Sequence, residues 1–131
     1  MEAGTKHFRK RDAILTCLRA STEHPGAEAV YEQVRQEIPN ISLATVYRNL
    51  SLFKDQGLIA SLGTVKGVER FDGNTAAHVH FICHGCGRIV DLPHISVPEE
   101  LSDAVTRVSG GQVDSCQLSF NGLCEECTKL N

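Results

Sequence analysis

The N-terminal half of the chain is organised around residues 41–50, which read ISLATVYRNL. Ser42 is a favourable helix N-cap, and the helix that it begins is predicted to run to about Gln56, with Gly57 as its C-terminal stop. Apolar side chains at helical spacing line one face of this segment, and polar or aromatic side chains lie on the others. The pattern predicts an amphipathic helix.

Two further helices are predicted before this segment and a β-hairpin after it. Apolar residues recur at helical spacing over residues 6–20 and 27–38. Residues 59–65 and 68–72 flank Lys66-Gly67, a pattern typical of a two-stranded hairpin. Three short helices followed by a hairpin describe a winged helix-turn-helix domain, although small helical domains without a DNA function show a similar pattern.

The second half of the chain is predicted to be a small α+β unit. Its expected elements are strands at 78–83 and 87–92, a helix at 98–108 and a third strand at 112–120. A unit of this size buries little core by itself. The predicted fold class is therefore α+β, with a winged-helix DNA-binding domain at 1–72, a hinge at 73–77 and a second domain at 78–131.

Composition restricts the class of protein. The chain has 131 residues, 41% of them hydrophobic and 22% charged, which is a globular balance. No apolar run approaches the roughly 20 residues of a membrane span, and the polar N-terminus lacks a signal-peptide core, so we expect a cytoplasmic protein. Residues 1–75 hold ten Lys/Arg and nine Asp/Glu, and residues 76–131 hold three and seven. This asymmetry indicates a division of labour, unless the basic residues simply form a solvated helix face.

Four of the six cysteines form two matched CxxC pairs. Cys83 and Cys86 make the first pair, and Cys124 and Cys127 make the second. Four thiolates at this spacing suit the tetrahedral geometry of Zn²⁺, and the alternative, two redox-active disulfides, is less common for paired motifs in a cytosolic domain. We therefore expect structural zinc that ties the C-terminus to the preceding hairpin. Cys17 and Cys116 are expected to be small core residues.

A second constellation is His78-Val79-His80. Residues i and i+2 of a strand project from the same face, so both imidazoles can reach one ion. If the Cys83–Cys86 segment is the turn of a hairpin, Asp91 falls about opposite His80 and can join them. Two imidazoles and a carboxylate suit Fe²⁺ or Mn²⁺, whereas the alternative is a surface histidine pair.

Together these motifs resemble the ferric uptake regulator (Fur) family of bacterial metal-dependent repressors. The resemblance rests on residues 41–50 and on the HxH and CxxC motifs of residues 78–87, and it extends from the first helix through Cys127. It implies a winged helix, a C-terminal dimerisation domain with structural Zn²⁺ and a regulatory Fe²⁺ or Mn²⁺ site at the junction. It also implies a homodimer that binds double-stranded operator DNA and is not an enzyme.

The resemblance further implies which residues hold the regulatory metal. In the peroxide-sensing (PerR) branch the matching positions are His24, Asp72, His78, His80 and Asp91. Iron sensors typically have Glu at the positions of Asp72 and Asp91, so Asp at both favours peroxide sensing by oxidation of a ligating histidine. A further metal site common in iron sensors lacks its residues here, since Ala77 and Val79 stand at two of its positions.

The third helix and the N-terminus supply candidate DNA contacts. Thr45, Tyr47 and Arg48 are expected in the major groove, although Tyr47 packing against the second helix is an alternative. Lys10, Arg11 and Lys66 are expected to contact phosphates. Other hypotheses are an iron- or zinc-responsive repressor, a non-haem iron enzyme and a zinc-stabilised interaction module.

Overall fold

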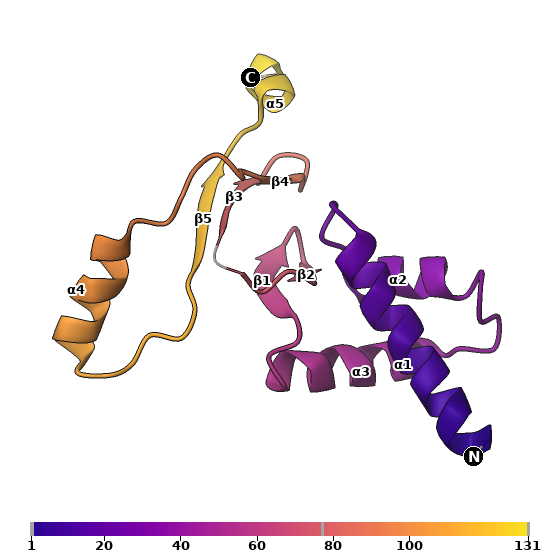
Figure 1. The fold of residues 1–131 in the computed structure, drawn as a ribbon. Helices are drawn as coiled ribbons and strands as arrows, with labels where there is room; N and C mark the ends of the chain where they lie inside the picture. The colour runs from indigo at the N-terminus through magenta and orange to yellow at the C-terminus, as the bar shows by residue number, and fades with distance from the viewer. Residues whose placement is uncertain (1, 77, 131) are drawn as a thin grey trace. The chain divides into compact units, whose positions relative to one another are not determined.

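The computed structural model describes residues 2–76 and 78–130, with side chains from residue 8 onward. The chain divides into two compact units, Met1–Thr75 and Ala76–Asn131 (Figure 1). This division falls within the predicted hinge at 73–77, whose last residue, Ala77, lies outside the described residues. No described helix is both long enough and apolar enough to cross a membrane.

The N-terminal unit contains three helices followed by a hairpin, as predicted. Its elements are α1 (Glu2–Ala20), α2 (Ala27–Val34), α3 (Leu43–Asp55), β1 (Ala60–Val65) and β2 (Val68–Asp72). Several boundaries differ from the prediction, most of them by one residue and two by four. The first helix begins at Glu2 instead of residue 6, and the second ends at Val34 instead of residue 38, because residues 35–38 form a turn that brings the N–H of Ile38 back to the carbonyl of Val34.

Local signals in the sequence fix α3 and the hairpin. The Ser42 hydroxyl accepts a hydrogen bond from the backbone N–H of Thr45 at 3.1 Å, which confirms Ser42 as the N-cap of α3. Lys66 and Gly67 both have positive φ, 51° and 81°, as a tight turn between twisted antiparallel strands requires. The β1–β2 pairing therefore forms where the sequence predicted a hairpin.

One hydrophobic core holds the N-terminal unit together. Ile14 and Leu18 of α1, Val30 of α2, and Leu50 and Phe53 of α3 are almost completely buried. Burying side chains of this size stabilises the fold by roughly 1.5–3 kcal/mol each before the loss of conformational entropy is counted. The remaining members of the core are Cys17, Ala27, Val34, Ile38, Ile41, Val46, Ile59 and Phe71. The prediction for Cys17 is consistent with this burial, which also raises the pKa of its thiol.

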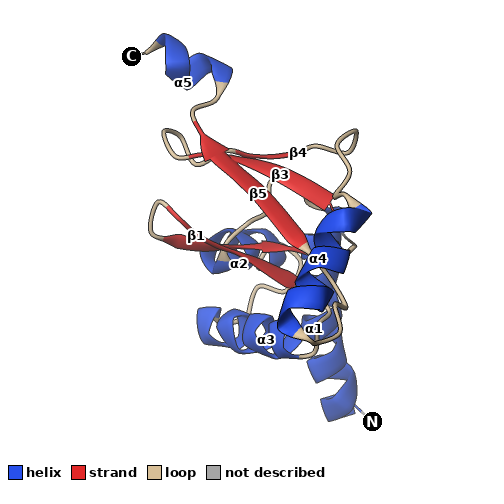
Figure 2. Cartoon of the chain, turned by 90° about the vertical axis from the view of Figure 1, so that its left-hand side faces the viewer, coloured by secondary structure: helices blue, strands red, loops and turns tan. Residues whose placement is uncertain are grey.

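The C-terminal unit is built on a three-stranded sheet. Its elements are β3 (His78–Cys83), β4 (Ile89–Asp91), α4 (Glu99–Ser109), β5 (Gln117–Gly122) and α5 (Glu125–Lys129). The strand order is β4-β3-β5, with β4 antiparallel and β5 parallel to the central strand (Figure 2). The predicted third strand began too early, at residue 112, so Cys116 precedes β5 and is only partly buried. The short helix α5 was not predicted.

The core of the C-terminal unit is small. Val79, Ile82 and Ile89 are its buried aliphatic residues among those described. The helix α4 contributes no buried residue to it. This sheet therefore needs stabilisation from something other than its own hydrophobic packing.

Candidate metal centres and nucleic-acid interface

The C-terminal unit brings the four predicted zinc cysteines together. Cys83 ends β3 and Cys86 follows in the turn to β4, while Cys124 caps α5 and Cys127 lies within it. The four Sγ atoms lie within 4.8 Å of one another, and those of Cys86 and Cys124 are 3.9 Å apart. No disulfide joins any of the six cysteines, all of which belong to the described residues. This is a compact set of four thiols contributed by two segments distant in sequence, the end of β3 with its following turn and the start of α5.

The thiols of this cluster differ in acidity. Sγ of Cys83 accepts hydrogen bonds from the backbone N–H groups of Cys124, at 3.3 Å, and Cys86, at 3.5 Å. These donors lower the pKa of Cys83 to about 5. The neighbouring sulfurs, Cys124 first, raise the pKa of Cys127 to about 12. Four thiolates so close together would repel one another, and a bound divalent cation would stabilise all four in the deprotonated form. The donor set therefore fits Zn²⁺.

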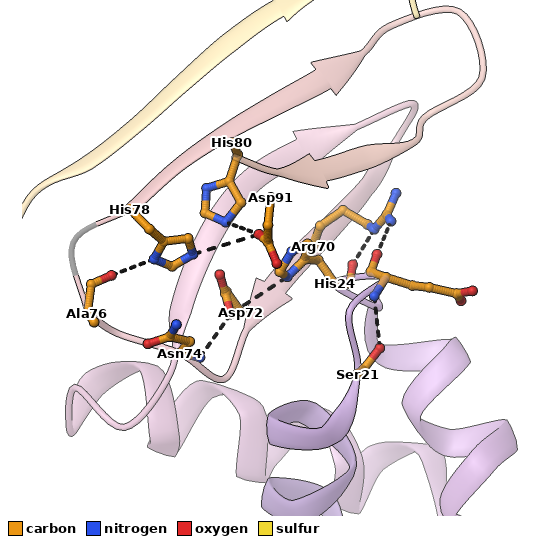
Figure 3. A network of polar contacts seen from close by, with 10 residues as sticks. Ser21, His24, Arg70, Asp72, Asn74, Ala76, His78, His80 and Asp91 are labelled. Atoms are coloured by element: carbon orange, nitrogen blue, oxygen red, sulfur yellow. Dashed lines mark hydrogen bonds and ion pairs between the residues drawn. The ribbon is translucent and has the colours of Figure 1, made fainter. Parts of the chain in front are cut away.

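The HxH motif and Asp91 meet on the β3–β4 hairpin. His80 pairs with Asp91 in the strand register, as the sequence predicted. Nε2 of His80 lies 3.2 Å from Oδ1 of Asp91, and Nε2 of His78 lies 3.9 Å from the same oxygen (Figure 3). The carbonyl of Ala76 can only accept a hydrogen bond, so Nδ1 of His78 carries the proton directed at it, 2.5 Å away. In a neutral imidazole this leaves the lone pair of Nε2 on the side of Asp91.

The N-terminal unit supplies a second pair of donors. Asp72 is the last residue of β2, and its Oδ1 lies 3.7 Å from Nδ1 of His24 and accepts a hydrogen bond from the Asn74 N–H at 2.8 Å. His24 lies in the loop that precedes α2, with φ 53°. The glycine and proline that follow delay the start of α2 to Ala27.

Sequence reasoning missed Arg70, which lies two residues before Asp72 on β2. Its guanidinium donates hydrogen bonds to the backbone carbonyls of Glu23 and His24 (Figure 3). The alternation of side chains along a strand, which puts residues 70 and 72 on one face, is the signal that could have indicated it.

The C-terminal unit carries both thiol donors and imidazole and carboxylate donors, and the N-terminal unit carries a further imidazole–carboxylate pair. The thiols lie at one end of the C-terminal sheet, whereas the nitrogen and oxygen donors lie on the β3–β4 hairpin and beside β2. Imidazole and carboxylate ligands suit Fe²⁺ and Mn²⁺, and clustered thiolates suit Zn²⁺. The chain therefore carries two kinds of donor with different metal preferences.

The exposed face of α3 has the character of a nucleic-acid interface. Tyr47 is 53% exposed, and Arg48 is exposed beside it. Between α3 and α1 lies a groove of about 260 Å³. It is lined by Phe8, Lys10, Arg11, Thr45, Arg48, Asn49 and Leu52. Three predicted DNA-contacting cations thus share one concave surface, and Lys66 is exposed at the tip of the hairpin.

One of these cations has an additional contact. The guanidinium of Arg11 lies over the ring of Phe53, 5.4 Å from its centroid. Arg11 therefore lines the groove beside α3 and also contacts an aromatic ring of the hydrophobic core.

Known proteins resemble this chain over nearly its whole length. Residues 2–121 match the ferric uptake regulator family. The peroxide operon regulator of Bacillus subtilis is 38% identical over 128 residues, covering 98% of this chain and 88% of that protein. The peroxide-responsive repressor PerR of Staphylococcus epidermidis is 37% identical, covering 96% of this chain and 83% of that protein.

Solved structures of peroxide and ferric uptake regulators are also similar to this chain. The Campylobacter jejuni peroxide stress regulator has a TM-score of 0.83 at 28% identity, covering 96% of this chain and 94% of that one. The Helicobacter pylori ferric uptake regulator, described as having three functional metal-binding sites, has a TM-score of 0.71 at 25% identity, covering 92% and 80%. These relatives are named as regulators or repressors, not enzymes. The chain described here belongs to the ferric uptake regulator family.

Proposed function

We propose that this protein is a metal-dependent transcriptional repressor that binds operator DNA as a homodimer and senses peroxide. The observation that carries the proposal is the imidazole–carboxylate chemistry of its donors, with aspartate at both carboxylate positions. The peroxide-related names of the relatives support the same function.

Structural Zn²⁺ would be held by Cys83, Cys86, Cys124 and Cys127. Two observations support this assignment, the proximity of the four Sγ atoms and the lowered pKa of the Cys83 thiol. The ion would close the loop between the two CxxC pairs and compensate for the small apolar core of this unit.

Regulatory Fe²⁺ or Mn²⁺ would be held by His24, Asp72, His78, His80 and Asp91. The first two belong to the N-terminal unit and the last three to the C-terminal unit, so binding would restrain one unit against the other. In a two-fold dimer that restraint sets the spacing of the two DNA-binding units, which must match successive turns of the major groove. A preference of a few kcal/mol for the restrained state suffices to switch affinity.

When bound, Fe²⁺ would activate a peroxide beside the ligating imidazoles, so that overall one peroxide oxygen is transferred to an imidazole carbon and the other leaves as water. His24 and His78 are the side chains that we expect to gain oxygen. An oxidised imidazole is a poorer donor, so the restraint between the units is lost and repression ends. Mn²⁺ would support DNA binding without this sensitivity.

DNA recognition is assigned to α3 and to the basic residues around it. Thr45, Tyr47 and Arg48 would read base edges and adjacent phosphates in the major groove. Lys10, Arg11 and Lys66 would contact the backbone, which makes binding weaken as the salt concentration rises. The exposure of Tyr47 and the basic groove beside α3 support this orientation.

The homodimer is assigned to the C-terminal unit. Leu101, Val105 and Val108 of α4 are 42%, 48% and 88% exposed and recur at helical spacing, and Phe120 of β5 is 53% exposed. Within the described sheet β5 is an edge strand, with β3 on one side only. Apolar side chains and a strand edge on the same small unit are suited to pairing with a second copy.

Mass spectrometry of the Fe²⁺-loaded protein after peroxide tests the proposal. We expect a gain of one oxygen on His24 or His78, with parallel loss of operator binding in gel shifts. Protein loaded with Mn²⁺ is the control and should keep both its mass and its DNA binding. Unmodified histidines together with intact iron-dependent DNA binding would identify an iron-responsive repressor, and a response to Zn²⁺ alone would identify a zinc-responsive one.

Asp91→Glu provides a matched variant for the same assay. The longer carboxylate keeps the charge and the oxygen donors, so metal-dependent DNA binding should persist. It changes the position of the oxygens relative to His78 and His80, so oxidation should fall sharply. Unaltered peroxide sensitivity in this variant would contradict the role given to the aspartate.

A further inference from the structure

The loop that carries His24 is held by the side chain of Arg70. Nη2 of Arg70 donates to the carbonyl of Glu23 at 2.6 Å, and Nε donates to the carbonyl of His24 itself (Figure 3). One planar guanidinium thus spans two successive peptide carbonyls, and the residues that it joins are 46 and 47 positions apart in the sequence. All of these groups lie within the N-terminal unit.

The backbone of β2 holds the same loop on its other side. The N–H of Phe71 donates to the carbonyl of Pro25 at 3.2 Å. Gly26 lies so close to β2 that an added Cβ would overlap Val68 and lie 2.9 Å from the carbonyl oxygen of Glu69. The loop is therefore docked along β2 by side-chain and main-chain contacts together.

His24 needs such support because of its backbone conformation. Its φ of 53° lies in the left-handed region, which costs free energy for a residue with a Cβ. In this conformation Nδ1 of the imidazole faces Oδ1 of Asp72 at 3.7 Å. Asp72 follows Arg70 by two positions on β2, so both side chains lie on the same face of this strand. That face therefore carries the carboxylate that neighbours the His24 imidazole and the guanidinium that holds the His24 backbone.

We propose that Arg70 is a positioning residue for the regulatory metal. It fixes the backbone of His24 so that the imidazole and the Asp72 carboxylate are already paired before a cation binds. The proposal rests on the proposed function, because it matters for regulation only if His24 is a ligand. Arginine suits the task because its fork of N–H groups satisfies two carbonyls at once, which the single ammonium of lysine does less well.

The direction in which loss of Arg70 changes the metal affinity distinguishes a positioning role from a purely electrostatic one. Removing a positive charge near a cation site would by itself strengthen cation binding. If Arg70 positions His24, removing it should instead weaken Mn²⁺ binding. Loss of an outer hydrogen-bonding partner of a metal ligand costs about 10- to 100-fold in affinity.

The test uses the full-length zinc-loaded protein with Arg70→Gln and Arg70→Lys. Mn²⁺ affinity is measured by titration calorimetry, and amide hydrogen exchange of Phe71 is measured in the absence of Mn²⁺. We expect about tenfold weaker Mn²⁺ binding for both variants and roughly tenfold faster exchange at Phe71. Arg35→Gln is the control. The Arg35 side chain contacts the Glu32 carboxylate, at 3.4 Å, and the Tyr31 ring, 5.5 Å from its centroid; neither residue belongs to the His24 loop or to β2, so this substitution should change neither quantity.

Several outcomes would overturn the inference. Mn²⁺ affinity that is unchanged or increased in Arg70→Gln would exclude positioning, as would full retention of affinity by Arg70→Lys, which keeps the charge but loses the planar fork that spans two carbonyls. If the glutamine variant does not fold, the lysine variant carries the test. His24→Ala distinguishes the two proposals: if it leaves Mn²⁺ binding intact, the proposed function fails, whereas weakening by His24→Ala but not by Arg70→Gln rejects the role of Arg70 alone.

Discussion

The carboxylate of Glu69 lies on β2 beside Arg70 and stabilises the hairpin through two contacts. It accepts a hydrogen bond from the Ser61 hydroxyl on β1 at 2.7 Å and lies 3.3 Å from Nζ of Lys54 on α3. The hydroxyl first, and then the ammonium, hold the pKa of Glu69 below its ordinary value. Because the pKa of Glu69 is lower in the folded than in the unfolded protein, its ionised carboxylate stabilises the fold at pH values above the unfolded-state pKa. This stabilisation is lost as the pH falls through the folded-state pKa.

Glu69→Gln should therefore destabilise the N-terminal unit in a pH-dependent way. Because the side chain is 42% exposed and screened by solvent, we expect a loss of up to about 1 kcal/mol at pH 7, shrinking below about pH 4.5. Urea unfolding followed by tyrosine fluorescence measures it, since both tyrosines lie in this unit and the chain has no tryptophan. Glu32→Gln, at an exposed pair with Arg35, is the control, and an equal pH-dependent loss there would argue against the assignment.

At the scale of elements, local signals predicted most of the fold. The Ser42 cap, the Lys66-Gly67 turn and the pairing of His80 with Asp91 each depend on residues close in sequence, and the structure agrees with all three. The second helix was predicted too long because Val34 and Ile38 keep helical spacing through a turn. The third strand of the C-terminal unit was predicted to start at residue 112, which was wrong. The start of β5 is set by its pairing with β3, a strand distant in sequence, from the pair His78 and Gln117 onward.

The candidate site shows the same limit. The HxH motif and the CxxC pairs are local patterns, so their spacing alone indicated metal chemistry. His24 and Arg70 are linked only by tertiary contacts between a loop and a strand, and no periodicity relates them. The resemblance indicated His24, whereas Arg70 was missed, because strand alternation places it on the face of Asp72 but does not show which backbone carbonyls it reaches.

The contact between α1 and the segment after β2 gives a prediction at this scale. A Cβ at Gly73 would lie 2.8 Å from the backbone N of Arg19 and 2.9 Å from its Cα, at the end of α1. Because backbone atoms cannot move aside as a flexible side chain can, Gly73→Ala should destabilise the N-terminal unit by about 1–3 kcal/mol. The tyrosine-monitored urea transition should shift accordingly. An unshifted transition in Gly73→Ala would show that the end of α1 moves aside and that the predicted overlap carries no cost.

At the scale of the whole molecule, the two units differ in what stabilises them. The large aliphatic and aromatic core belongs to the N-terminal unit, whereas the C-terminal unit buries few aliphatic side chains and gathers four thiols. His78, His80 and Asp91 lie on the β3–β4 hairpin, and the end of β3 with the turn that follows it carries Cys83 and Cys86 of the thiol cluster. Integrity of the regulatory donors should therefore depend on zinc, although the two proposed metals use separate ligands.

Removing zinc should unfold the C-terminal unit and leave the N-terminal unit folded. After chelation we expect loss of sheet signal in far-UV circular dichroism, an unchanged tyrosine-monitored transition and loss of Mn²⁺-dependent operator binding, because the hairpin donors lose their geometry. Cys86→Ser should reproduce this result, while Cys116→Ser, which alters a cysteine outside the cluster, should keep zinc and DNA binding. A Cys86→Ser protein that retains its sheet and its Mn²⁺ response without zinc would show that hydrophobic packing alone holds this unit together.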